Sequence, residues 1–128
     1  MTSKFTELAI DCADPHGLAR FWCAVLDYEV QDEDDGLVTI GSPLVPGGKD
    51  RPGPVPPVLT FARVPEGKTV KNRLHLDLNP TDREQEEEVR RLLGLGAQHT
   101  DVGQGDAAWV VLADPEGNEF CVLASRRP

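Results

Sequence analysis

Residues 8–28, LAIDCADPHGLARFWCAVLDY, decide the fold, because residues 74–96, LHLDLNPTDREQEEEVRRLLGLG, repeat their pattern. An offset of 68 positions pairs residues of similar character, among them Leu8 with Leu76, Ile10 with Leu78, Asp14 with Asp82 and Val25 with Leu93. Repeats of supersecondary size determine the architecture of a chain. We therefore expect two copies of one supersecondary unit.

The first copy predicts a strand, a capped helix and three further strands. Leu8, Ile10 and Cys12 alternate with other residues, as in a half-buried strand. Asp14 suits an N-cap and Pro15 the first helical turn, where its missing N–H is not needed. The helix then has an apolar stripe of Leu18, Phe21, Trp22, Val25 and Leu26. Residues 28–31, 37–40 and 57–64 predict strands, and the Pro- and Gly-rich residues 42–57 a long loop.

The second copy gives the same order of elements. Leu74, Leu76 and Leu78 alternate with polar residues, which predicts a strand whose leucines face the helix. Thr81 and Glu84 fit a capping box ahead of that helix. Strands follow at 97–100, 107–113 and 119–125, the last two joined by the turn DPEGN. The predicted order is therefore βαβββ, twice.

These patterns predict an α+β fold in a single domain, residues 1–128. Two paired βαβββ modules, about 5–64 and about 73–125, would form a curved, mainly antiparallel sheet of eight strands. We expect a central cleft where the modules meet, with both helices outside.

Composition excludes some partners. A net charge of −9 argues against nucleic acid and against an anionic membrane surface, since both would be repelled. No stretch approaches the length of apolar sequence that a membrane span needs. The three cysteines are odd in number and widely spaced, which indicates reduced thiols and a cytoplasmic protein.

Strand alternation selects the residues expected to line the cleft. If the apolar side of each first strand faces its helix, Glu7, Ala9 and Asp11 face the cleft in one copy. In the other copy these are His75, Asp77 and Asn79, and the last strand adds Glu119, Cys121 and Leu123. Asp11 and Asp77 could act as general acid and base, or could be solvated or paired with Arg63 or Arg73.

Three strings carry a family resemblance: LAIDCADPHGLARFWCAVLDYEV (8–30), RVPEGKTVKNRLHLDL (63–78) and ADPEGNEFCVL (113–123). The chain resembles the vicinal oxygen chelate superfamily, which includes glyoxalase, fosfomycin- and bleomycin-resistance proteins and extradiol dioxygenases. Within it, the chain is similar to the small glyoxalase-like domain proteins of bacteria. The resemblance implies a small-molecule ligand and a homodimer.

The resemblance also implies metal ligands on the first and last strands of each module. The first-strand positions fall on Glu7 and His75, while the terminal glutamate of the family falls on Cys121. The fourth position falls near Phe61, which cannot ligate. Glu7, His75 and Cys121 would suit Zn²⁺ better than Mg²⁺ or Mn²⁺. The alternative is a metal-free cup in which Glu7 and His75 hydrogen-bond and Cys121 is an apolar filler.

Two functions follow from the resemblance. The first is a metal-dependent lyase or isomerase for a small polar or aromatic metabolite, with Glu7, His75 and Asp77 as catalytic residues. The second is a non-catalytic, metal-free protein that sequesters a ligand, as drug-resistance members do. The residues expected to contact substrate are Asp11, Phe61, Arg73 and Trp109. Lys68, Lys71 and Arg73 form a basic run that could hold a carboxylate or phosphate, or could be a plain surface connection.

Overall fold

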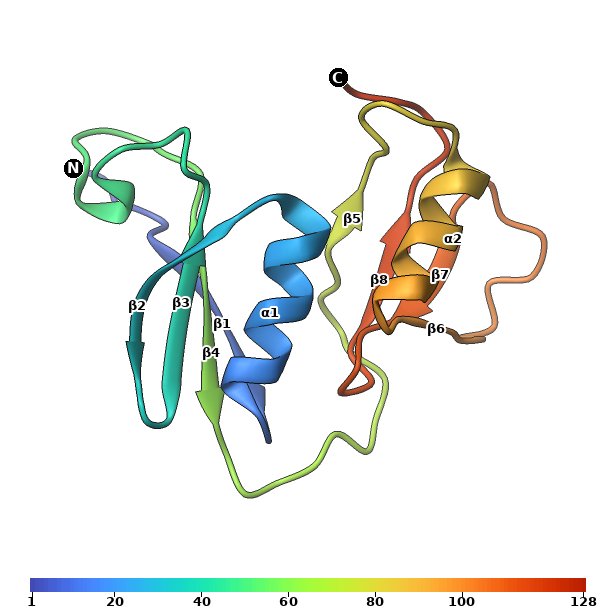
Figure 1. Cartoon of the computed structure of the whole chain (residues 1–128), viewed down its shortest axis with the longest axis horizontal. Helices are drawn as coiled ribbons and strands as arrows, with labels where there is room; N and C mark the ends of the chain where they lie inside the picture. The colour runs from blue at the N-terminus through green and yellow to red at the C-terminus, as the bar shows by residue number, and fades with distance from the viewer. The chain divides into compact units, whose positions relative to one another are not determined.

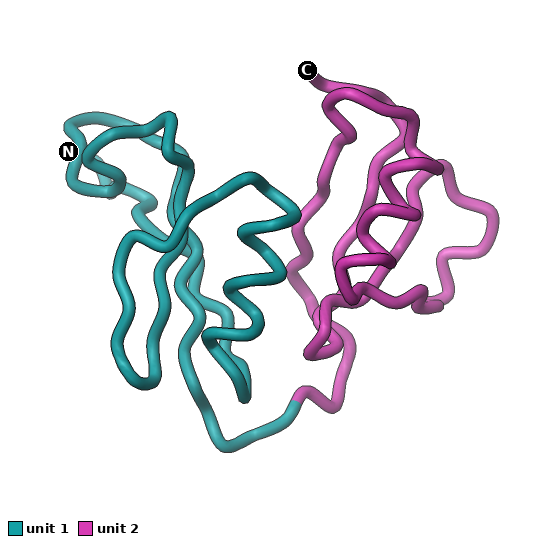
Figure 2. Tube along the Cα trace, in the orientation of Figure 1, with its two compact units in different colours: residues 1–67 teal, residues 68–128 magenta.

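The computed structural model describes residues 1–128 and contains the predicted elements in the order βαβββ, twice (Figure 1). The first set is β1 (Glu7–Cys12), α1 (Pro15–Leu26), β2 (Glu29–Asp34), β3 (Leu37–Gly41) and β4 (Val58–Arg63). The second is β5 (Asp77–Leu78), α2 (Gln85–Leu95), β6 (Gln98–His99), β7 (Val110–Ala113) and β8 (Glu119–Val122). They fall into two compact units, unit 1 (Met1–Gly67) and unit 2 (Lys68–Pro128) (Figure 2). One predicted module lies in each unit.

Each unit has one four-stranded sheet, and the two sheets have the same topology. The strand orders are β1-β4-β3-β2 and β5-β8-β7-β6. In both, the first and last strands of the module pair in parallel and the other neighbours are antiparallel. The parallel pair requires a long crossover connection, and the helix and the two middle strands of each module form it. The predicted α+β class and mainly antiparallel pairing are confirmed.

The core of unit 1 forms where α1 packs on β3 and β4 (Figure 1). The side chain of Asp14 accepts a hydrogen bond from the backbone N–H of Gly17 at 3.1 Å, and Pro15 is the first helical residue, both as predicted. Trp22 and Leu18 are fully buried on the helix, opposite buried residues of the sheet such as Ile40. The loop at 42–57 has no strand and only a 3₁₀ turn, η1 (Gly48–Asp50).

In unit 2 two local predictions are wrong. The helix begins at Gln85, with Glu84 as an N-cap whose side chain makes no capping hydrogen bond, so Thr81 and Glu84 form no capping box. Leu74 is 80% exposed and does not face the helix. The reason is that β5 lies at the sheet edge and pairs with β8 over Asp77–Leu78, after Leu74. The unit 2 core instead includes the fully buried Leu92, Leu112, Phe120 and Val122.

Neither α1 nor α2 combines the length and apolar character that crossing a lipid bilayer requires.

Candidate functional site

The pairing of β5 with β8 gathers the polar residues of unit 2 on one face of its sheet. Asp77 lies opposite Cys121 in the parallel register, and the N–H of Cys121 donates to the carbonyl of Leu76 at 2.9 Å. Because side chains alternate along a strand, His75, Asp77 and Cys121 share one face. Phe120 and Val122 are buried on the other. The predicted alternation of β8 is therefore confirmed.

His75, Asp77 and Cys121 form a compact cluster. The Nδ1 atom of His75 lies 2.8 Å from Oδ1 of Asp77 and 3.8 Å from Sγ of Cys121. One ligand atom from each of the three residues lies within 4.8 Å of the others. The side chains of His75 and Asp77 are 42% and 47% exposed, whereas Cys121 is buried at 7%. The thiol side of the cluster is therefore buried, and the imidazole and carboxylate are accessible from solvent.

The donor chemistry of this cluster fits a zinc ion. An imidazole nitrogen, a carboxylate oxygen and a thiolate sulfur are all zinc ligands, and three protein ligands leave a position for water or substrate. A thiolate does not suit Mg²⁺, which takes oxygen ligands. The sequence predicted Glu7, His75 and Cys121 as ligands and Asp77 as an acid–base residue. The structure adds Asp77 as a third ligand candidate.

The surroundings of Cys121 raise the pKa of its thiol. Burial raises its pKa, and the negative charge of Asp77 and a hydrogen bond to that carboxylate raise it further. The positive charge of Lys71 opposes this rise in the pKa of Cys121 only in part. A raised pKa makes a thiol a poor nucleophile by itself, because the thiolate is the reactive species. Ligation of a metal would require this thiol to lose its proton, and the charge of a bound cation would favour that loss.

The cluster lies in a pocket of about 380 Å³ formed entirely by unit 2. Its lining combines polar and apolar side chains: Lys71, Asn72, His75, Asp77, Val102, Gly103, Gln104, Trp109, Val111, Glu119, Cys121 and Leu123. Trp109 is 45% exposed and lines this pocket, and its predicted contact with a substrate stays a prediction. Arg73, the other substrate-contacting residue predicted in this unit, is exposed and is not part of the lining.

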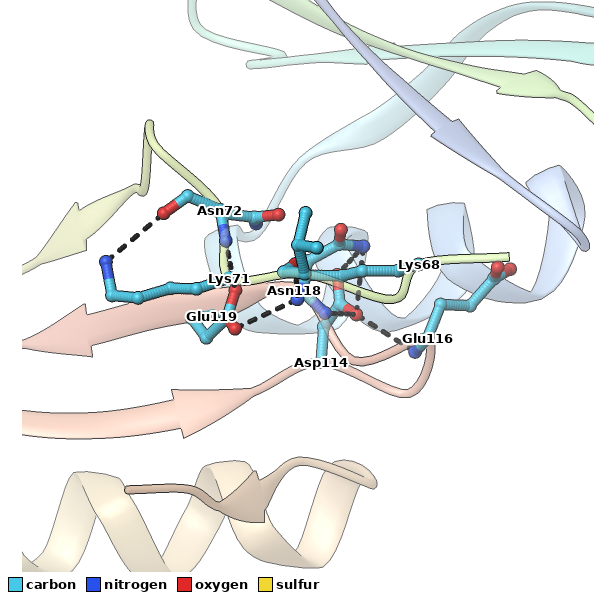
Figure 3. A network of polar contacts seen from close by, with 8 residues as sticks. Lys68, Lys71, Asn72, Asp114, Glu116, Asn118 and Glu119 are labelled. Atoms are coloured by element: carbon cyan, nitrogen blue, oxygen red, sulfur yellow. Dashed lines mark hydrogen bonds and ion pairs between the residues drawn. The ribbon is translucent and has the colours of Figure 1, made fainter. Parts of the chain in front are cut away.

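One side of the pocket is fixed by a polar network that the sequence did not reveal (Figure 3). The carboxylate of Glu119 accepts hydrogen bonds from Nζ of Lys68 at 2.9 Å and from the backbone N–H of Asn72 at 3.0 Å. Burial raises the pKa of Glu119, but these donors outweigh it and the net pKa is lowered. Lys68, predicted as part of an anion-binding run, is therefore committed to an ion pair. The one sequence feature that pointed to this network is the position of Glu119 directly after the DPEGN turn.

The residues predicted in unit 1 lie on two faces of its sheet. The carboxylate of Glu7 pairs with Nζ of Lys49 at 2.8 Å, and Asp11 is exposed. Phe61 is 0% exposed and belongs to the core, so the face it occupies is not open to a ligand. The structure describes each unit by itself, and the expected sharing of one site by Glu7 and His75 stays a prediction.

Strand register corrects the alignment of the fourth ligand position. Ala9 corresponds to Asp77 in the repeat, and its partner in β4 is Thr60, just as the partner of Asp77 in β8 is Cys121. Thr60 is therefore the counterpart of Cys121, one residue before Phe61. Its hydroxyl lies 3.0 Å from that of Thr39, and both side chains are buried. A slip of one residue exchanges the two faces of a strand, which explains why Phe61 lies in the core.

Comparisons with known proteins agree with this architecture. A family model described as a glyoxalase-like domain matches residues 7–123. The chain is similar to a glyoxalase/bleomycin resistance protein/dioxygenase family enzyme from Burkholderia phytofirmans PsJN, with a TM-score of 0.66 and 14% identity over 94% of this chain and 97% of that one. It is similar to the fosfomycin resistance protein FosX from Mesorhizobium loti, with a TM-score of 0.64 and 11% identity over 98% and 94%.

A third similar structure is a mutant FosX from Listeria monocytogenes, solved with Mn(II) and 1S,2S-dihydroxypropylphosphonic acid. Its TM-score is 0.66, with 11% identity over 98% of this chain and 91% of that one. No curated protein sequence matches the chain. At these identities the structural matches establish the shared fold.

Proposed function

This chain belongs to the glyoxalase-like domain family, and on that premise we propose that it binds a small molecule at a zinc ion held by His75, Asp77 and Cys121. The observation that carries the proposal is the gathering of three donor atoms within 4.8 Å, in a pocket of about 380 Å³. We further propose that the protein is a lyase or isomerase that moves a proton on a small polar or aromatic metabolite.

The donor set supports this choice of metal. His75, Asp77 and Cys121 would hold the zinc ion, whose contribution would be to polarise a substrate oxygen or acidify a water molecule and so ease proton removal. Nδ1 of His75 and Oδ1 of Asp77 lie 2.8 Å apart, close enough for one ion to bind both residues. Cys121 supplies a ligand from the rigid side of the pocket, because its backbone N–H is bonded to Leu76. The Listeria FosX structure, which holds a metal with a small anionic ligand, supports a site of this general kind in the family fold.

Zinc titration by calorimetry tests the metal proposal. We expect one zinc ion per chain for the wild-type protein and at least about tenfold weaker binding for His75→Ala and for Cys121→Ser, since each loses a ligand. His99→Ala is the matched control, because His99 is exposed in β6 and does not line the pocket. Equal zinc affinity in wild type and His75→Ala would contradict the proposal.

Proton exchange tests the catalytic part. Phenylpyruvate is a small aromatic oxo acid whose carbon-bound proton next to the carbonyl exchanges slowly with solvent. In D₂O we expect zinc-loaded protein to accelerate this exchange, measured by proton NMR, and His75→Ala to lose the acceleration. The Glu7→Gln variant tests in the same assay whether Glu7 takes part. Zinc binding without any acceleration would argue for a binding protein.

A second function, metal-free sequestration of a ligand, is favoured by one feature of the pocket. Part of its lining is apolar and includes the accessible indole of Trp109; the other apolar residues are Val102, Val111 and Leu123. A protein of this kind would bind aromatic molecules equally well with and without zinc and would change the fluorescence of Trp109. The predicted homodimer stays a prediction for either function, and sedimentation analysis of the full chain tests it.

A further inference from the structure

We propose that the unit 2 pocket selects molecules that carry an acidic group next to an apolar or aromatic body, and that Lys71 recognises the acidic group. This inference rests on the proposed function in one respect, since it takes the same pocket as the ligand site. It adds a substrate class and a specificity residue.

Lys71 is the cation of the pocket that is free to bind a ligand. Its side chain lines the pocket, and its ammonium group donates to the backbone carbonyl of Asn72 at 3.2 Å (Figure 3). It makes no ion pair, because none of the salt bridges of the chain includes it. A carboxylate or phosphonate could therefore take up this charge without displacing a protein carboxylate.

The two neighbouring cations differ from Lys71. Lys68 is 21% exposed and is bound to the carboxylate of Glu119 at 2.9 Å, so its charge is already neutralised. Arg73 is exposed but lies outside the pocket lining. Among the three residues of the basic run, Lys71 is therefore the one that can contact a molecule bound in the pocket.

The remaining lining residues leave Lys71 as the group that can bind an acidic substituent, and they supply apolar surface beside it. The negative charge of Glu119 is compensated by Lys68, and the carboxylate of Asp77 is hydrogen-bonded to His75. Lys71 is therefore the lining cation that has no carboxylate partner, while Asp77 keeps its negative charge beside His75. Trp109 and Leu123 provide apolar surface for the rest of the ligand. This combination of a few polar groups with an apolar wall is typical of small-molecule sites.

The test compares 1-naphthoate with 1-naphthamide, which share a ring system and differ in charge. Binding to the full chain is measured by calorimetry, first after zinc removal with a chelator, so that a metal cannot hold the carboxylate. We expect the wild-type protein to bind naphthoate about fivefold more tightly than naphthamide, the size of effect that a partly exposed ion pair provides. Lys71→Met should abolish the preference, and Lys71→Arg should keep it.

Lys4→Met is the matched control, since it removes the same charge from an exposed residue of unit 1. It should leave the preference unchanged. A Lys71→Met protein that still prefers naphthoate would overturn the inference, as would a wild-type protein that binds both compounds equally or binds neither. If the preference is present but no zinc binds, the metal proposal fails and this inference stands. If zinc binds and the preference is absent, this inference fails by itself.

Discussion

Glu119 illustrates how a single carboxylate links two parts of unit 2. Its side chain is 13% exposed and joins β8 to the segment before β5 through Lys68 and the N–H of Asn72. Hydrogen bonds to a charged group contribute about 1.5–3 kcal/mol each when both partners are positioned. We therefore expect Glu119→Gln to lower the free energy of unfolding at neutral pH by about 1–2 kcal/mol, measured by urea denaturation.

The contribution of Glu119 to the free energy of unfolding should depend on pH. Because the pKa of Glu119 is lower in the folded protein than its ordinary value of 4.5, its contribution is present above that value. It is lost as the pH falls through the folded-state pKa. The stability difference between wild type and Glu119→Gln should therefore shrink as the pH falls below about 4.5. A difference that stays constant or grows over this range would show that the ion pair with Lys68 does not stabilise the fold.

Asp114 has a comparable role in the turn between β7 and β8. It is 3% exposed, and its carboxylate accepts hydrogen bonds from the backbone N–H groups of Glu116 and Asn118 at 2.9 and 3.0 Å. Asp114→Ala would leave these donors without their acceptor, at a cost of about 2–3 kcal/mol in unfolding free energy. The exposed Asp106→Ala is the control and should change stability by less than about 0.5 kcal/mol. Equal effects of the two substitutions would refute the role given to Asp114.

At the scale of elements, two glycines at the C-terminal end of α2, one inside the helix and one directly after it, should respond oppositely to alanine. Gly94 lies inside the helix, and the position that an alanine Cβ would occupy is open, so Gly94→Ala should stabilise the protein by about 0.5–1 kcal/mol. Gly96 ends the helix with a φ of 120°, which alanine tolerates poorly, so Gly96→Ala should destabilise it. Thermal unfolding of both variants decides the matter. A loss of stability in Gly94→Ala would mean that this part of α2 is not a regular helix.

Elements with a strong local signal could be predicted from the sequence. The cap of α1 at Asp14 was predictable because an acidic residue directly precedes Pro15 and a broad apolar stripe. Thr81 and Glu84 match the capping-box pattern equally well, yet α2 begins only at Gln85. The residues after Pro80 instead form the connection from the edge strand β5 to the helix. Local patterns identify a helix more reliably than the residue at which it begins.

The candidate site was predictable in part for the same reason. Alternation along β8 correctly placed Cys121 with His75, because it needs only the strand period. Choosing Phe61 in place of Thr60 needed the register between β1 and β4, which depends on pairing between segments far apart in the sequence. The ion pair of Lys68 with Glu119 was likewise inaccessible, because 51 positions separate the two residues.

At the scale of the whole molecule, a ligand that binds in unit 2 should slow amide hydrogen exchange in unit 2 and leave it unchanged in unit 1. A metal at His75, Asp77 and Cys121 would connect β5 to β8, whose pairing includes the N–H of Cys121 and the N–H of Leu123. Binding to the folded state lowers the population of locally opened states. Zinc should therefore slow hydrogen exchange at these two amides, followed by NMR. The amide of Val38 in β3 of unit 1 is the internal reference and should exchange at an unchanged rate.

The central claim, that the thiol of Cys121 acts as a metal ligand together with His75 and Asp77, is tested most directly with Co²⁺ in place of zinc. Cobalt bound to a thiolate absorbs in the near ultraviolet through sulfur-to-metal charge transfer. We predict that this absorption accompanies stoichiometric cobalt binding in the wild-type protein and in Cys23→Ser, and disappears in Cys121→Ser. A cobalt-bound wild-type protein without the absorption, or a Cys121→Ser protein that retains it, would contradict the account.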